Sequence, residues 1–279
     1  IGHAVYGAVF GKIHDVVEDG NVKRASPEFM HPFYQAGPAA ECALCRYESD
    51  VFGAGFRDNF FATSFNLHKV TRHILKPNGA TYASTDSDFL VSDNVDFHPT
   101  DVLPDADGSL LVLDTGGWYK LCCPSSQLAK PDVLGAIYRV RKIGAPKLTG
   151  KTRQAAYAKL VKPPGVDLKN PATALQLSVL TAPQKARAKF VKVLSQQSSA
   201  TDGTNAHALR AAAEGLGRLS DKTAVPTILE AVGHAGTDIV LEQALIRALI
   251  DIDAAVPTRT GLQSKNSVVQ RAALIALDQ

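Results

Sequence analysis

The first half of the chain alternates short apolar runs with turn residues, whereas the second half does not. Asp58-Asn59 precedes the run FFATSF, and Asp107-Gly108 precedes the run SLLVLD. Such turn residues supply the positive φ of a tight hairpin, so these runs predict short antiparallel strands. The second half instead carries Ala and Leu at helical spacing, in HALRAAAEGLGRL, VLEQALIRALIDI and VVQRAALIALDQ. The pattern therefore predicts a β-rich front and an α-helical back, joined near RKIGAPKLTG.

The strand pattern of the first half repeats. The two turns begin 49 positions apart, and each is followed by an apolar strand and then by a basic one, HKVTRHIL or GAIYRVRK. An earlier EDGN, from Glu18 to Asn21, is interpreted as a third copy. Short antiparallel strands that recur every ~40–50 residues are typical of a β-propeller. We therefore expect residues 1–145 to form roughly three C-terminal blades of a larger, all-β propeller, with the other blades upstream.

The helical pattern of the second half also repeats, at about 30 residues. The matching apolar positions are Leu209 with Leu241, Val240 with Val268, Ala244 with Ala272, and Ala248 with Ala276. Small residues on one helix face allow helix pairs to stack closely into a solenoid. We predict a HEAT-like solenoid over residues 146–279, an architecture that binds protein partners more often than it catalyses reactions.

Charge and composition change this picture little. The net charge of +3 conceals a basic block from Arg139 to Lys192, which carries 13 Lys and Arg but one acid, Asp167. The block could dock an anionic partner or form solvated helix faces, and without aromatics or Gly-rich loops it does not indicate nucleic-acid binding. No apolar run approaches the ~18 residues of a membrane span. We expect both ends to continue into further sequence, through which the protein could associate with a membrane.

Two loops of the last predicted blade are expected to open on one face. In a propeller blade, the loop before the inner strand and the loop between the second and third strands lie on the same side. Here these loops are NVDFHP and TGGWYKLCCPSSQLAKPDVL. The candidates for this mouth face are His98, Thr100, Asp101 and Trp118.

Each of the mouth-face candidates has a functional and a structural interpretation. His98 could act as a base or a ligand near neutral pH, although a histidine before proline at a strand entry more often orders its own loop. Trp118 could stack on a sugar ring or plug the loop against its blade. The Asp101 carboxylate could order backbone donors or contact a substrate.

Two long segments resemble a known family. CALCRYESDVFGAGFRDNFFATSFNLHKVTRHIL and the later DFHPTDVLPDADGSLLVLDTGGW are similar to the late blades of glucose/sorbosone dehydrogenase propellers. They resemble the planctomycete-type membrane-bound dehydrogenases more closely, strongly over residues 38–142 and loosely after 150. The resemblance implies a propeller, HEAT repeats and a c-type cytochrome segment with a Cys-x-x-Cys-His haem site, in a protein of the periplasm or cell envelope.

The resemblance also implies a redox function, the oxidation of a sugar or polyol with electrons passed to c-type haem. Quinone-dependent members of the broader family bind pyrroloquinoline quinone, a tricarboxylate, through basic side chains. His98 and Thr100 stand where that family has two arginines, and no lysine lies near Phe65-Asn66. We therefore expect no cofactor within these residues, and the catalytic histidine of the family belongs to an earlier blade. The alternative is a non-catalytic scaffold whose propeller face and solenoid bind carbohydrate or protein.

The four cysteines are Cys42, Cys45, Cys122 and Cys123. Cys42-x-x-Cys45 is followed by Arg46 where a haem attachment site needs histidine. A vicinal pair also fits tetrahedral zinc poorly, so no metal site is predicted. Disulfides between adjacent blades suit an exported protein, and free buried thiols or a metal site stay as alternatives.

Overall fold

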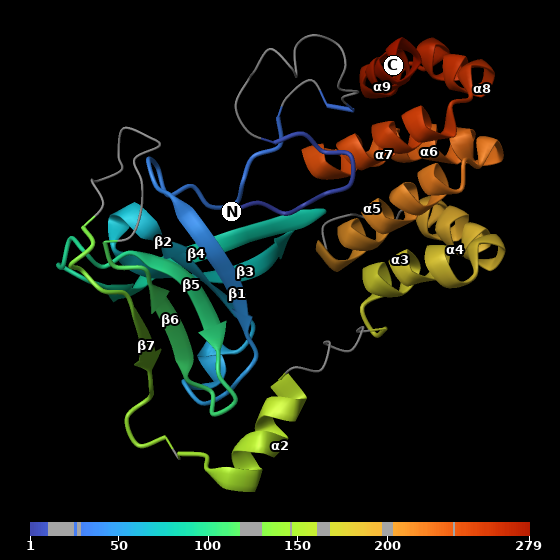
Figure 1. Cartoon of the computed structure of the whole chain (residues 1–279). Helices are drawn as coiled ribbons and strands as arrows, with labels where there is room; N and C mark the ends of the chain where they lie inside the picture. The colour runs from blue at the N-terminus through green and yellow to red at the C-terminus, as the bar shows by residue number, and fades with distance from the viewer. Residues whose placement is uncertain are drawn as a thin grey trace. The chain divides into compact units, whose positions relative to one another are not determined.

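The computed structural model describes residues 1–10, 25–26, 29–117, 130–145, 147–160, 168–196, 203–236 and 238–279. Among these residues, seven strands precede the α-helices in chain order (Figure 1). The strands are β1 (Glu41–Tyr47), β2 (Asn59–Ser64), β3 (Lys69–Asn78), β4 (Thr81–Val91), β5 (Pro99–Pro104), β6 (Leu110–Asp114) and β7 (Ala136–Val140). The α-helices are α2 (Gly150–Leu160), α3 (Pro171–Thr181), α4 (Pro183–Ser195), α5 (Gly203–Arg218), α6 (Val225–His234), α7 (Ile239–Ile252), α8 (Ala255–Arg259) and α9 (Ser267–Asp278).

The strands form two open antiparallel sheets, one of β1-β2-β3-β4 and one of β5-β6-β7. The prediction of a β-propeller is therefore wrong, because the described strands do not close into a ring of blades. Each sheet is a meander in which neighbouring strands are also sequence neighbours. Turn residues and apolar runs specify hairpins, and many antiparallel architectures use the same hairpins. The turns at Asp58 and Asp107, 49 residues apart, belong to hairpins of two different sheets and not to blades of a closed ring.

By packing, the chain forms two compact units that are discontinuous in sequence. The first unit comprises Ile1–Phe33, Pro77–Ala83 and Val166–Gln279, and the second comprises Tyr34–Lys76 and Ser84–Gly165. Because packing units follow contacts and not sequence ranges, the domain ranges 1–145 and 146–279 stay a prediction.

The core of the second unit is built from the inward positions of its strands. Leu110 and Val112 alternate with more exposed neighbours along β6, as expected for a strand with one buried face. The buried members are Tyr47, Phe61, Val70, Phe97, Val102, Leu110 and Val112. Tyr47 also reaches the β5–β6 turn, where its hydroxyl donates a hydrogen bond to the carbonyl oxygen of Gly108 at 2.5 Å.

Small residues allow the helices of the first unit to pack closely, as the Ala-rich pattern predicts. Helix α5 contacts α3, α4 and α7, and α7 in turn contacts α6 and α9. A Cβ on Gly215 of α5 would lie 2.6 Å from the Phe190 ring of α4, so glycine is required there. Of the helices that the structure describes, none has the length and apolar character of a membrane span.

Helix starts follow the capping chemistry of the sequence. Asn170 accepts hydrogen bonds from the backbone nitrogens of Ala172 and Thr173 at the start of α3. Asp238 does the same for Val240 and Leu241 at the start of α7. Such caps satisfy backbone donors that have no partner within the helix.

Candidate functional site

His98, one of the mouth-face candidates, is buried and held by its own loop. Its backbone nitrogen donates to the Asp114 carboxylate at 2.9 Å, and its Nδ1 lies 2.8 Å from the carbonyl oxygen of Gly116. The rings of Phe65 and His68 lie 4.6 and 5.4 Å from its ring, centroid to centroid. With the residue 2% exposed, these contacts are those of a histidine that orders a loop.

The other mouth-face candidates also interact locally. The Thr100 hydroxyl donates to the carbonyl oxygen of Leu113 at 3.4 Å, across the β5–β6 pair. The Asp101 carboxylate accepts a hydrogen bond from the backbone nitrogen of the next residue at 2.8 Å. Trp118 lies outside the described residues. A contact of these side chains with substrate stays a prediction.

Two of the four cysteines lie in the described part of the chain, and both carry free thiols on β1. Cys42 is exposed, whereas Cys45 packs against the core of the second unit. Burial raises the pKa of the Cys45 thiol to about 12 and also raises the pKa of Cys42. Cys122 and Cys123 lie outside the described residues, so a disulfide between the two pairs stays a prediction.

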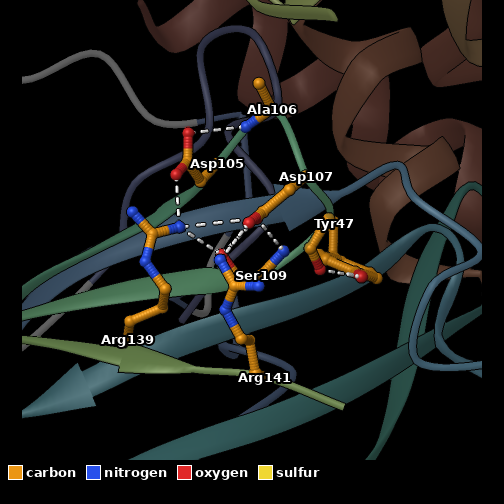
Figure 2. Close-up of polar contacts among 8 residues, drawn as sticks. Tyr47, Asp105, Ala106, Asp107, Ser109, Arg139 and Arg141 are labelled. Atoms are coloured by element: carbon orange, nitrogen blue, oxygen red, sulfur yellow. Dashed lines mark hydrogen bonds and ion pairs between the residues drawn. The ribbon is translucent and has the colours of Figure 1, made fainter. Parts of the chain in front are cut away.

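A network of acids and arginines surrounds the β5–β6 turn (Figure 2). Arg139, on β7, bonds the Asp105 carboxylate, and Arg141 bonds the Asp107 carboxylate at 2.5 Å. Burial alone would raise the pKa of both aspartates. Hydrogen bonds from Arg139 to Asp105 and from Ser109 to Asp107 outweigh burial, so both pKa values lie below their usual range. The network joins β7 to the turn and leaves neither acid available for proton transfer.

Three polar side chains of β3 and β4 form a chain that runs from the buried Thr71 and His73 to the exposed Asp86. His73 Nδ1 lies 2.8 Å from Asp86 Oδ1, and His73 Nε2 lies 2.8 Å from Thr71 Oγ1. The Tyr34 ring lies 4.4 Å from the His73 ring. An acid, a histidine and a hydroxyl in this order match a nucleophilic triad. However, Thr71 and His73 are 2% and 0% exposed, so no substrate reaches the hydroxyl, and the chain stabilises the sheet.

In the first unit, helices α5 and α7 hold residues from the start of the chain. The guanidinium carbon of Arg218 lies 4.6 Å from the centroid of the Tyr6 ring, and that of Arg247 lies 5.8 Å from it. The Gln243 side-chain nitrogen donates to the Tyr6 carbonyl oxygen at 3.4 Å. A Cβ on Gly7 would lie 2.8 Å from Arg247, so glycine allows this close approach. We call this arrangement the Tyr6 clamp, comprising Tyr6, Arg218, Gln243 and Arg247.

The helices that hold Tyr6 also carry buried polar atoms without partners. Such an atom costs about 1–3 kcal/mol when it is left unsatisfied. Within the part of the chain that the structure describes, the buried atoms without a hydrogen-bond partner are Arg210 Nε, Gln243 Oε1, Arg247 Nε and Asp251 Oδ2. All four belong to α5 or α7. The unsatisfied side-chain atoms thus lie inside the pair of helices that holds Tyr6.

A second cluster of the first unit joins residue 3, the β3–β4 turn and α5. His3 Nδ1 lies 3.1 Å from the Thr81 hydroxyl, and His207 Nε2 lies 2.9 Å from the Thr81 carbonyl oxygen. The Tyr82 ring packs against both imidazoles. Burial, with repulsion by Arg210 and His207, lowers the pKa of His3 to about 4. Burial also lowers the pKa of His207.

The sequence predicted neither the Tyr6 clamp nor the second cluster, which comprises His3, Thr81, Tyr82 and His207. Their members are distant along the chain, so no local pattern connects them. The sequence does contain one indication of a polar helix face. Arg210, Glu214 and Arg218 follow one another at intervals of four residues, which places all three on one face of α5. Across the described residues, no group of three or more His, Cys, Asp or Glu is placed to hold a metal ion.

Comparisons with known proteins give no match: no family model, no curated protein and no solved structure is similar to this chain. The sugar or polyol dehydrogenase function, the c-type haem and the periplasmic location implied by the family resemblance therefore stay predictions.

Proposed function

We propose that this chain is a non-catalytic scaffold that binds peptide segments on the face of α5 and α7. The observation that carries the proposal is the Tyr6 clamp, in which two arginines lie over the ring of Tyr6 and Gln243 bonds its main chain. An arginine over an aromatic ring contributes about 0.5–1 kcal/mol at an exposed site. Main-chain hydrogen bonds add affinity without requiring a particular sequence.

The clamp defines the kind of segment that it fits. A tyrosine or phenylalanine is required beneath the two arginines, because both recognise the face of an aromatic ring. The residue after the aromatic must be small, since Gly7 already lies close to the Arg247 side chain. An apolar residue before it is favoured, as Val5 is 6% exposed and packs with the helical core. The preferred motif is therefore an apolar residue, an aromatic and a glycine.

The proposal is tested with a labelled peptide of residues 1–10, IGHAVYGAVF, added to the full chain. A Tyr6→Ala chain weakens its own segment in the clamp, so we expect it to bind the peptide more tightly than the unmodified chain does. Fluorescence anisotropy measures the dissociation constants. In the Tyr6→Ala chain, Arg218→Gln should weaken peptide binding by roughly twofold to fivefold.

Arg271→Gln is the matched control, because Arg271 pairs with Glu242 and has no contact with Tyr6. It should leave peptide affinity unchanged. Equal binding of the peptide to the unmodified and Tyr6→Ala chains would contradict the proposal. So would equal affinity for a peptide in which the tyrosine is replaced by alanine.

A further inference from the structure

Helices α3 and α5 enclose a pocket of about 260 Å³. This is just below the ~300–1,000 Å³ of typical small-molecule sites, so it suits a ligand of a few non-hydrogen atoms and not a large cofactor. Apolar side chains of α3 form one wall, and the polar residues Glu214 and Arg218 of α5 lie opposite. The lining residues are Thr173, Gln176, Leu177, Val179, Leu180, Ala211, Glu214, Gly215 and Arg218.

The two charged residues of the pocket are one helical turn apart and yet do not pair with each other. The buried Glu214 carboxylate binds Arg210 instead, with Oε1 at 2.8 Å. The Arg218 guanidinium lies over the Tyr6 ring, and the structure gives it no carboxylate partner in the described chain. Residues four apart on a helix are close enough to form an ion pair. Glu214 and Arg218 do not form one because Arg210 binds the first and Tyr6 contacts the second. The pocket thus keeps a hydrogen-bond acceptor and a cationic donor side by side.

The apolar wall completes the set of recognition groups. Leu180 is 74% exposed and Leu177 is half-buried, so both present hydrocarbon that a ligand would remove from water. Burying apolar surface contributes about 25 cal/mol per Å². A ligand with one apolar branch and two opposite charges would therefore match every part of the pocket.

We propose that the pocket between α3 and α5 binds a free α-amino acid with an apolar side chain, such as leucine. The ligand's ammonium group donates to Glu214, its carboxylate accepts from Arg218, and its side chain packs against Leu177 and Leu180. A simple fatty acid has no donor for Glu214, and a simple amine has no acceptor for Arg218. The proposal goes beyond segment binding, because the pocket is lined by α3 and is separate from the groups that contact the backbone of Tyr6.

Calorimetric titration of the full chain with leucine tests the proposal. We expect leucine to bind with a dissociation constant in the millimolar range or below. Two probes, isocaproate and isoamylamine, lack the ammonium and the carboxylate of leucine respectively. Each should bind about tenfold or more weakly than leucine, since a charge-assisted hydrogen bond is lost in either case. Failure of leucine to bind, or equal binding of either probe, would overturn the proposal.

Substitutions locate the site. Arg218→Gln should weaken leucine binding about tenfold or more. Arg271→Gln is the matched control, because Arg271 pairs with Glu242 and belongs neither to the pocket lining nor to the Tyr6 clamp, and it should leave leucine affinity unchanged. Leu180→Ala, at an exposed position that tolerates change, should weaken leucine binding severalfold. An equal effect of Arg271→Gln and Arg218→Gln would place the leucine site elsewhere and overturn the assignment.

Discussion

The backbone nitrogen of Ala80 donates a hydrogen bond of 2.7 Å to Oδ2 of Asp238. The other oxygen of the same carboxylate caps helix α7. Asp238 therefore joins the turn between β3 and β4 to the start of a helix that lies more than a hundred residues later in the chain. Gly79 makes this contact possible, since its φ is +55° and a Cβ there would collide with the Asp238 carboxylate.

Asp238→Ala should lower the free energy of unfolding by about 2 kcal/mol, because it removes both a helix cap and a charge-assisted hydrogen bond. Urea unfolding followed by circular dichroism measures the change. Asn170→Ala is the control, since Asn170 caps α3 alone. It should cost about 1 kcal/mol. Equal losses in the two variants would show that the Ala80 contact adds nothing.

Arg139→Gln should lower the free energy of unfolding more than the substitution of an arginine in a surface ion pair does. It removes the ion pair of Arg139 with Asp105, whose side chain is 5% exposed. Breaking an ion pair of a buried carboxylate is costly, so we expect a loss of about 3 kcal/mol in the free energy of unfolding. The pKa of Asp105 should also rise, as burial is no longer outweighed.

Arg46→Gln provides the comparison for Arg139→Gln. Arg46 pairs with Asp58 at 2.8 Å, but both side chains are about half exposed. Such surface pairs contribute about 0–1 kcal/mol. If chemical denaturation gave similar losses for both variants, the network at the β5–β6 turn would be no more than a surface ion pair.

The His3 and His207 cluster should make stability depend on pH. The folded pKa of both imidazoles lies below the usual value of 6.5, at about 4 for His3. The unfolded chain therefore binds more protons in this range, and stability falls as pH decreases from about 6.5 towards 4. Above that window the histidines are neutral in both states and have no effect.

Urea midpoints measured across this pH range test the effect, with His3→Gln as the variant. Because His3→Gln removes a titrating imidazole, the urea midpoint of this variant should change less with pH between 6.5 and about 4. Asp105 and Asp107 also lose stabilising charge in acid, but with pKa values below the usual 3.8 they act at lower pH. An unchanged slope in His3→Gln would contradict the depressed pKa.

Cys45 should react slowly with alkylating reagents at pH 8, since its pKa of about 12 leaves almost no thiolate. Cys42 is exposed and should react faster, although its pKa is also raised. Mass spectrometry of a chain with Cys122→Ser and Cys123→Ser isolates these two thiols. Urea should remove the difference between them. Equal rates in the folded chain would show that Cys45 is not buried.

The sequence predicts local elements better than their assembly. The runs HALRAAAEGLGRL and VVQRAALIALDQ form helices α5 and α9, and the run SLLVLD forms strand β6, because helical spacing and burial patterns act within a few residues. The propeller was wrong since the closure of sheets depends on contacts between strands that are distant in sequence. Hairpin signals contain no information on how many sheets meet or around which axis.

The candidate site shows the same limit. His98 was a candidate because its loop was expected to open on the mouth face, but its ring is held by Gly116 and packed against Phe65. The clamp was missed because Tyr6 and its arginines are separated by more than two hundred residues. The spacing of Arg210, Glu214 and Arg218 was present in HALRAAAEGLGRL, where the apolar positions alone were interpreted.

Arg218 belongs both to the clamp on Tyr6 and to the lining of the pocket between α3 and α5. Suppose that a small ligand in the pocket changes the affinity of the clamp for a segment by some factor. The segment then changes the affinity of the pocket for the ligand by the same factor, because the two binding free energies are thermodynamically linked. A carboxylate that draws the guanidinium away from the ring would oppose segment binding. Under the two proposals above, the shared Arg218 side chain would therefore make binding of a segment and binding of an amino acid oppose each other.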